Sequence, residues 1–229
     1  MTLPLSPFTT RLLAVLLFVL AMAAPVRGQS NPGAARQGGF AGVTFVPQFN
    51  FDGLTFDGQT VYKEIDGEEL AFLPRVEKQP LFRGILGYRA RNASLEISYD
   101  RTSHDASFED FPMATTFQAV NVDGRFFFLT SSRVQPYALV GGNYAFLRIK
   151  DSAVLGDEVG DVRFDGFGVN SEAGVAVFPV PRLGIHVGYA YRVLWFEKAR
   201  SGVSDKLFEL RPRFRETAGS LSITGTYVF

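Results

Sequence analysis

The sequence contains no cysteine. It therefore cannot form a disulfide framework, a thiolate metal site or a cysteine nucleophile. Net charge is also missing, because 23 lysines and arginines balance 23 aspartates and glutamates, and this balance gives no indication of a nucleic-acid partner. Beyond the first residues, long apolar runs are missing too. The nearest candidate for a spanning helix, residues 173–196, is interrupted by prolines and charged side chains.

One uninterrupted apolar run stands near the start of the chain. Arg11 precedes apolar residues from Leu12 to Ala24, and small residues follow up to Gly28. This order predicts a secretory signal peptide over residues 1–28. An uncleaved anchor helix is the alternative, although the run is shorter than the roughly 20 residues that such a helix needs. We expect an exported chain with a short periplasmic segment over residues 29–38 and one domain over residues 39–229.

What the remaining sequence has in quantity is period-two alternation, which is typical of half-buried strands. In the segment "ASLEISYDR", Leu95, Ile97 and Tyr99 share one face, while Glu96 and Asp100 lie on the other. In one segment, 135–146, both faces are mostly apolar, so its orientation stays open. The predicted strands cover residues 39–49, 80–89, 93–101, 116–128, 135–146, 167–177, 183–193 and 220–229.

The predicted connections alternate between two kinds. Short turns are expected at residues 91–93, 129–133 and 179–182, whereas long polar loops are expected at residues 50–78, 102–114, 148–161 and 197–211. This order predicts an all-β fold, an eight-stranded antiparallel up-and-down transmembrane β-barrel with short periplasmic turns and longer extracellular loops. A soluble β-sandwich or a soluble ligand-binding barrel would also alternate and remains the alternative.

Aromatic residues favour the membrane alternative. They gather near the predicted strand ends, as in the belts at membrane interfaces, and only a helix or a closed barrel satisfies its backbone in lipid. The residues expected in these belts are Tyr99, Tyr137, Trp195, Phe196, Tyr227 and Phe229.

These features together resemble the family of small eight-stranded outer-membrane barrels, similar to the OmpA transmembrane domain, OmpX and OmpW. The resemblance rests on the signal peptide and on "LEISYDR", "VQPYALVGGNYAF", "LGIHVGYAYR" and "TGTYVF". It implies an outer-membrane protein with a structural or surface-interaction role, surrounded by lipid and lipopolysaccharide, and a monomer. It also implies that the barrel-insertion machinery reads the last strand through Tyr227 and Phe229, although Gly225 interrupts the apolar series there.

Charged residues on the second face of the strands are expected inside the barrel. An eight-stranded barrel is just wide enough for side chains to fill, so we expect a packed, polar lumen whose charges balance in sign. A narrow path for ions or small solutes is the alternative. The predicted structural network comprises Arg83, Arg89, Glu96, Asp100, Asp123, Arg125, Glu172, His186 and Arg192.

Few residues are candidates for a catalytic or metal-binding role. His186 near Glu172 would be half of a general-base arrangement, and the resemblance includes lipid-modifying barrel enzymes, but "GIHVGY" offers no serine partner. His104, in a predicted loop, has too few neighbouring ligands for a metal site. We therefore expect no catalysis, no cofactor and no metal, with a lipid-modifying enzyme as the alternative.

Two external segments could contact partners. The outward face near the rim carries Arg211, Arg213 and Arg215, which could hold lipopolysaccharide phosphates by paired hydrogen bonds. A solvated loop is the alternative reading of these arginines. The long loop over residues 50–78 contains interspersed apolar residues and is the second candidate for partner contact.

Overall fold

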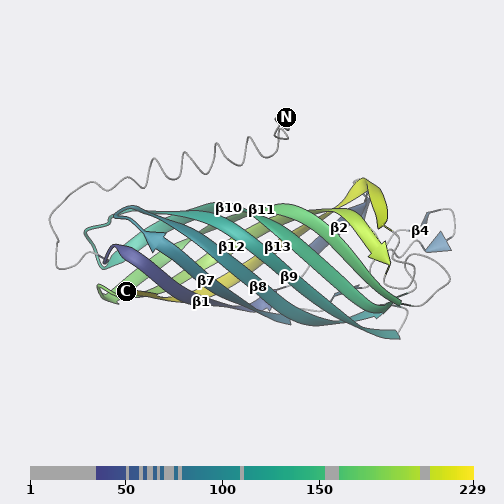
Figure 1. Cartoon of the computed structure of the whole chain (residues 1–229), viewed down its shortest axis with the longest axis horizontal. Coiled ribbons are helices and arrows are strands. Elements are labelled where there is room, and N and C mark those ends of the chain that lie inside the picture. Colours follow the sequence, from purple (N-terminus) through teal and green to yellow (C-terminus); the bar gives the residue numbers. More distant parts are fainter. Residues whose placement is uncertain are drawn as a thin grey trace, which may run out of the picture.

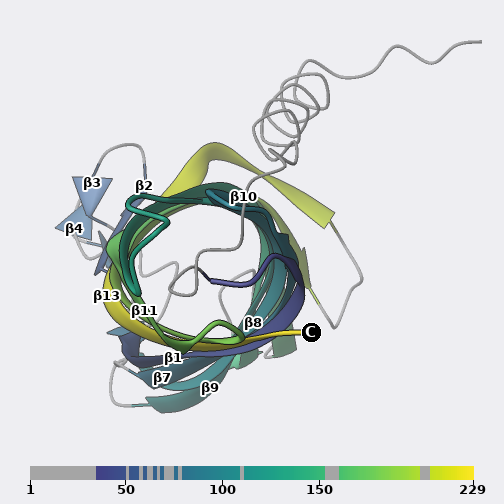
Figure 2. The ribbon, with the colours of Figure 1, turned by 90° about the vertical axis from the view of Figure 1, so that its left-hand side faces the viewer.

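The computed structural model describes residues 35–49, 52–56, 59–60, 64–65, 68–69, 75–76, 79–108, 111–152, 160–201 and 207–229. The signal peptide predicted over residues 1–28 lies outside this part of the chain. Within the described ranges, no helix has both the length and the apolar character needed to cross a membrane. The dominant feature is a cylinder of tilted strands, seen from the side in Figure 1 and end-on in Figure 2.

The wall of the cylinder contains eight strands, in agreement with the prediction. Consecutive strands pair antiparallel, and the first pairs with the last from Phe40 opposite Val228 to Phe45 opposite Ile223, which closes the sheet. The wall strands are β1 (Gly38–Phe49), β7 (Gln79–Arg89), β8 (Ala93–Phe108), β9 (Phe111–Phe127), β10 (Val134–Ser152), β11 (Gly160–Val180), β12 (Leu183–Ser201) and β13 (Leu207–Val228).

Five shorter strands lie between β1 and β7, where the sequence predicts one long loop. One of them pairs with β13 and another with β8, so parts of this segment attach to the rim of the barrel. They are β2 (Asp52–Phe56), β3 (Gln59–Thr60), β4 (Glu64–Ile65), β5 (Glu68–Glu69) and β6 (Arg75–Val76).

Strands extend far into the three other predicted long loops, which corrects the sequence prediction of the strand ends. β8 and β9 continue pairing until Phe108 lies opposite Phe111, and β10 reaches Ser152 before β11 resumes at Gly160. In β10 and β12 these segments resemble polar loops because outward positions such as Arg148 and Arg200 are charged, while inward positions such as Ile149 and Ala199 are apolar. The alternation therefore continues past the predicted strand ends, interrupted by register shifts such as the one between Phe196 and Lys198.

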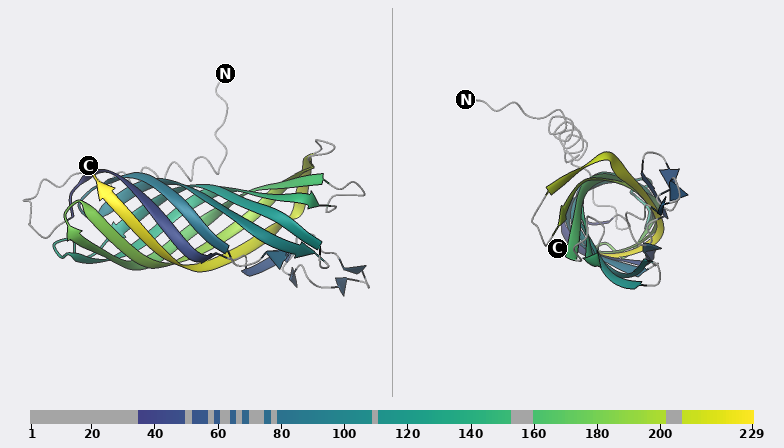
Figure 3. Two further views of the ribbon diagram at one scale, coloured as in Figure 1. Left: turned by 90° about the horizontal axis from the view of Figure 1, so that it is seen from below. Right: turned by 90° about the vertical axis from the view of Figure 1, so that its right-hand side faces the viewer.

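The wall is consequently longer than the membrane-spanning part of the barrels that the sequence resembles, and it projects at the end with the long connections. A strand of 21 residues such as β11, tilted by about 40°, rises roughly 50 Å. The apolar band of an outer-membrane barrel is only about 25 Å tall. In the barrel family that the sequence resembles, the short turns face the periplasm. The resemblance therefore predicts that the projecting end, with the long connections, is the extracellular end (Figure 3).

The interior is layered, which refines the predicted polar lumen. A central layer contains the charged residues, and an apolar cluster fills the extracellular part. A small aromatic cluster lies at the periplasmic end, where Phe127, Tyr137 and Phe178 pack together. The extracellular cluster, named here the upper core, comprises Val46, Phe49, Leu81, Phe117, Ala119, Ala145, Leu147, Ile149, Val162, Phe164, Leu194, Phe196, Ala199 and Ala218.

Two of the aromatic residues expected at the membrane interface lie inside instead. Phe196 is fully buried in the upper core because it shares the inward parity of Arg192. Tyr137 is also buried, because the odd-numbered positions of β10 face inward. The other four, Tyr99, Trp195, Tyr227 and Phe229, are at least partly exposed.

Candidate functional site: the filled interior and the outer rim

The centre of the barrel holds one carboxylate between two guanidinium groups. Asp100 on β8 is fully buried and pairs with Arg83 on β7, whose Nε lies 2.6 Å from the carboxylate Oδ1. On its other side, Arg192 on β12 donates to Oδ2 at 2.5 Å. These side chains meet because the wall is narrow enough for residues from nearly opposite strands to touch.

Three asparagines extend this central pair into a network. Arg192 Nε donates to Asn170 Oδ1 at 3.0 Å, and the Asn170 amide donates to Asn121 and to Asp123. Asn143 donates to the same Asn170 oxygen at 2.8 Å. Sequence reasoning missed these amides, although Asn121 and Asn170 each precede a predicted interior carboxylate by two residues and therefore share its face.

A second group of interior charges lies closer to the periplasmic end. Arg125 forms an ion pair with Glu96, with 3.1 Å between Nε and Oε1, and its Nη1 contacts His186 Nδ1. The other ring nitrogen of His186 lies 3.1 Å from the Thr226 hydroxyl. Because the ring faces a cation, the arrangement does not resemble a general base oriented by a carboxylate.

Glu172 has a different partner from the one considered from the sequence. The Tyr137 hydroxyl donates to Glu172 Oε1 in a short hydrogen bond. The proposed neighbour, His186, lies opposite Ala176 in the register, four residues further along β11. Among the described hydrogen bonds, the structure does not bring His186 and Glu172 together.

The periplasmic end of the lumen contains an arginine stacked between aromatic rings. The Arg89 guanidinium lies 3.7 Å from the centre of the Phe127 ring and 4.5 Å from that of Phe178. Its Nη2 donates to the Gln135 amide oxygen at 2.7 Å. Ala35, which precedes β1, packs against the same aromatic cluster. We name Arg89, Phe127, Gln135 and Phe178 the lower plug.

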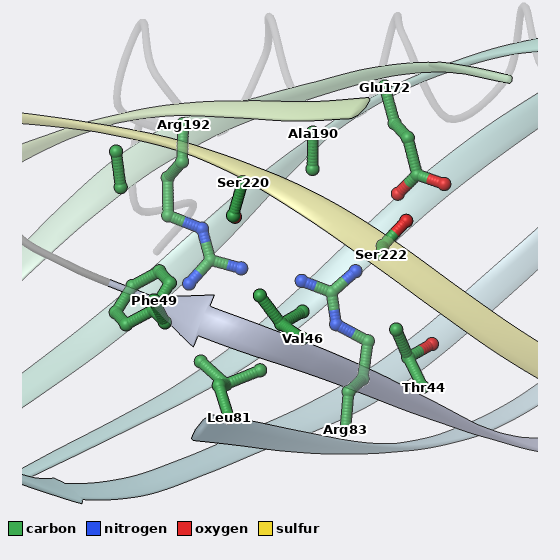
Figure 4. Close-up of a pocket in the computed structure, with 11 residues that line it drawn as sticks. Thr44, Val46, Phe49, Leu81, Arg83, Glu172, Ala190, Arg192, Ser220 and Ser222 are labelled. Atoms are coloured by element: carbon green, nitrogen blue, oxygen red, sulfur yellow. The ribbon is translucent and has the colours of Figure 1, made fainter. Parts of the chain in front are cut away.

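A small cavity lies between the central layer and the upper core (Figure 4). Arg83 and Arg192 point into it from opposite sides, and Glu172, Ser220 and Ser222 also line it. It offers about 20 Å³ for the centres of water molecules, which is enough for about one water. Arg192 Nη1 is buried without a protein partner, so this atom is where such a water would bind.

All nine residues of the predicted interior network are buried. The structure joins Arg83, Asp100 and Arg192 in one cluster and Glu96, Arg125 and His186 in another. Asp123 is linked to the first cluster through Asn170.

The outer surface changes character along the strands. Exposed apolar and aromatic side chains form a band around the periplasmic half of the cylinder, including Val43, Leu86, Ile97, Val122, Val140, Val169, Ile185, Tyr189 and Ile223. Farther toward the extracellular end, Phe167 and Trp195 stack with 5.5 Å between ring centres. Above them the described outer side chains are mainly charged.

Two remaining sequence candidates can be placed only in part. Arg215 is exposed on β13, whereas Arg211 and Arg213 lie in that strand but their side chains are outside the described set. His104 lies in β8 and not in a loop, and its side chain is also outside that set. Among the described residues, no group of three or more His, Asp or Glu side chains could hold a metal ion.

A sequence profile of the family described as "Outer membrane protein beta-barrel domain" matches residues 12–211. The chain belongs to this family. Its members are outer-membrane barrels, so the exposed apolar band faces lipid and the protein is located in the outer membrane.

Two solved structures show the same fold. Neisserial surface protein A is 14% identical, with a TM-score of 0.51, over 83% of this chain and 96% of the other. The outer membrane protein OprG from Pseudomonas aeruginosa is 12% identical, with a TM-score of 0.51, over 88% of this chain and 100% of the other. No curated protein sequence matches significantly.

Proposed function

We propose that this protein is a non-catalytic, closed outer-membrane barrel with a structural or surface-interaction role. The barrel supports a surface-exposed extension, which is the part of the wall that projects beyond the apolar band. The observation that carries the proposal is the filling of the interior, with the lower plug at one end and the upper core at the other. A barrel filled in this way is a rigid support, and its contacts with partners occur on its outer surface and loops.

The layering argues against the alternative of a narrow channel. An ion would have to pass the aromatic rings around Arg89, then the paired charges around Asp100, then a layer of apolar side chains. The last step is the most expensive, because an ion in an apolar environment loses its hydration without a compensating partner.

The alternative of a lipid-modifying enzyme receives no support from the interior chemistry. Such an enzyme needs a nucleophile and base that reach the outer leaflet. The described histidine, His186, is buried deep in the lumen against Arg125 and Thr226.

Planar-bilayer recording tests the closed interior. We expect the purified protein to give no conductance steps above background under conditions in which a general porin conducts. Reproducible single-channel steps would overturn the proposal.

The surface-exposed extension is tested separately through the absence of cysteine, which makes any introduced thiol unique. Lys150→Cys, on the outward face of β10, should react with a membrane-impermeant maleimide on intact cells. Ser131→Cys, in the exposed turn between β9 and β10, should react only after lysis. The opposite labelling pattern would show that the extension does not face the medium.

The proposal includes two partners. Tyr227, in the last strand, and Phe229, directly after that strand, are both exposed, which supports their reading by the barrel-insertion machinery. Arg211, Arg213 and Arg215 are proposed to contact lipopolysaccharide, and the protein is proposed to act as a monomer.

A further inference from the structure

Three arginines lie side by side on the outer surface of the extracellular extension. Arg148 on β10 is the register partner of Arg163 on β11, and Arg163 is the register partner of Arg200 on β12. All three side chains are exposed. Like charges directly opposite one another on a sheet are destabilising, so this row needs compensation.

In the part of the chain that the structure describes, two of the three arginines have a carboxylate partner. Arg148 pairs with Asp161, and Arg163 pairs with Asp165 at 2.7 Å. Among the described outer side chains of β10 to β12 at this height, five basic residues face three acidic ones. The basic residues, named here the basic rim, are Arg148, Lys150, Arg163, Lys198 and Arg200, and the acidic ones are Asp161, Asp165 and Glu197.

The contacts of Arg163 fix its guanidinium in place. Its Nε donates to Asp165, and its guanidinium lies over the Phe146 ring at 4.3 Å from the centre. The hydrogen bond to Asp165 uses Nε and not the two terminal nitrogens. A guanidinium that is already oriented loses less conformational entropy when it forms bidentate hydrogen bonds with a phosphate group.

The basic rim lies directly above an aromatic row. Tyr144, Phe167 and Trp195 are register partners across the same three strands. They precede the arginine row by four residues on β10, which corresponds to about 13 Å along the strand. Below them, Val140, Val169 and Tyr191 are exposed in the lipid-facing band.

We infer that the basic rim binds the phosphate groups of a phosphorylated glycolipid in the outer leaflet. The headgroup phosphates contact Arg148, Arg163 and Arg200, while the acyl chains lie along the apolar surface below Trp195. Stacked aromatic side chains mark the boundary between the two regions. This inference rests on the proposed function for the placement of the extension outside the cell.

Binding to the purified protein in nanodiscs tests the inference. The probe is bisphosphorylated lipid A, with dephosphorylated lipid A and soluble pyrophosphate as comparison ligands. The variant Arg148→Gln/Arg163→Gln/Arg200→Gln should weaken lipid A binding at least tenfold, and removal of the phosphates should have a similar effect. Pyrophosphate alone should compete poorly, because it lacks the acyl chains.

A matched control uses exposed arginines at the periplasmic end. Arg36→Gln/Arg133→Gln/Arg182→Gln removes the same charge and should leave lipid A binding unchanged. The charge-conserving variant Arg148→Lys/Arg163→Lys/Arg200→Lys should bind with intermediate affinity, because lysine lacks the planar fork. Heat-modifiable gel migration checks that every variant is folded.

Equal lipid A binding by the glutamine variant and the control would overturn the inference. So would equal binding of phosphorylated and dephosphorylated lipid A, and full competition by pyrophosphate would indicate a site for soluble phosphates. A failure of the proposed function would be detected by different experiments. It would give conductance steps in planar bilayers, or labelling of Lys150→Cys only after lysis, whatever the lipid A affinities are.

Discussion

Asp100 neutralises two buried guanidinium groups at the centre of the barrel. It is the common partner of Arg83 and Arg192, and the side chains of all three are at least nine-tenths buried. A buried ion pair adds little over apolar packing, but the loss of one partner leaves a charge without compensation. In this cluster the loss of one carboxylate affects two guanidinium groups at once.

We therefore expect Asp100→Asn to lower the free energy of unfolding by about 3–5 kcal/mol. Urea titration of protein refolded in lipid vesicles measures this change, with the gel shift of the folded barrel as readout. Asp161→Asn is the matched control, because its pair with Arg148 is exposed and such pairs contribute about 0–1 kcal/mol. Similar unfolding midpoints for the two variants would contradict the structural importance of Asp100.

Gly188 on β12 provides the space for a second interior contact. A Cβ at this position would lie 2.4 Å from the Tyr137 hydroxyl oxygen and 2.7 Å from Glu172 Oε1. We expect Gly188→Ala to separate this hydrogen-bonded pair and to cost about 1–3 kcal/mol. Gly225→Ala is the control, because nothing lies within 4 Å of a Cβ there. The same urea titration compares them, and an unfolding midpoint for Gly188→Ala equal to that of the control would refute this role.

At the scale of the strand, the sequence predicts the membrane-spanning parts well and the extracellular parts poorly. Alternation between apolar and polar residues locates β8, β12 and the end of β13 because lipid contacts one face there. Above the membrane the outward face is charged, as at Arg148 and Lys150, so the sequence pattern there resembles that of a polar loop. The inward apolar residues, such as Ile149, pack in the upper core with residues from many strands, and these contacts are not visible in one segment.

Bulges are the second reason why the sequence predicts the extracellular parts of the strands poorly. The register of β12 shifts between Phe196 and Lys198 relative to both of its neighbours, β11 and β13. On β11 the partners of these two residues are the adjacent Gly166 and Asp165. Each shift moves the following side chains to the other face. Alternation carried forward from Arg192 would place Lys198 inside, whereas it is exposed. The interior charges lie before these bulges, where parity correctly placed them on the inward face.

The extracellular extension should depend on its own core. Phe164 on β11 is almost fully buried in the upper core and packs against Phe196 with 6.4 Å between ring centres. We expect Phe164→Ala to cost about 3–5 kcal/mol locally and to increase proteolysis of the extension on intact cells. The membrane-spanning part should stay resistant, because lipid and the central layer hold it.

Tyr144→Ala is the control for this experiment, since Tyr144 is exposed on the outer face of β10. Mass spectrometry of the released peptides locates the cleavage sites. Cleavage of Phe164→Ala at the rate of the control would show that the upper core does not stabilise the extension.

For the whole molecule, the lower plug and the upper core act as two barriers in series. Each fills the lumen by itself, because an eight-stranded barrel has no room for a path beside large side chains. The central charged layer between them is compatible with water, as the cavity near Arg192 indicates. Conduction therefore requires that both ends be opened.

This arrangement leads to an expectation about combined variants in planar bilayers. Phe127→Ala/Phe178→Ala removes the rings that hold Arg89 at the periplasmic end, and Phe117→Ala/Phe164→Ala opens the upper core. We expect neither pair alone to conduct, because the opposite barrier stays in place. The quadruple variant, if its gel migration shows a folded barrel, should give small conductance steps. Conductance steps from Phe127→Ala/Phe178→Ala alone would show that the upper core is permeable. A folded quadruple variant without conductance steps would show that the main barrier is the charged layer around Asp100.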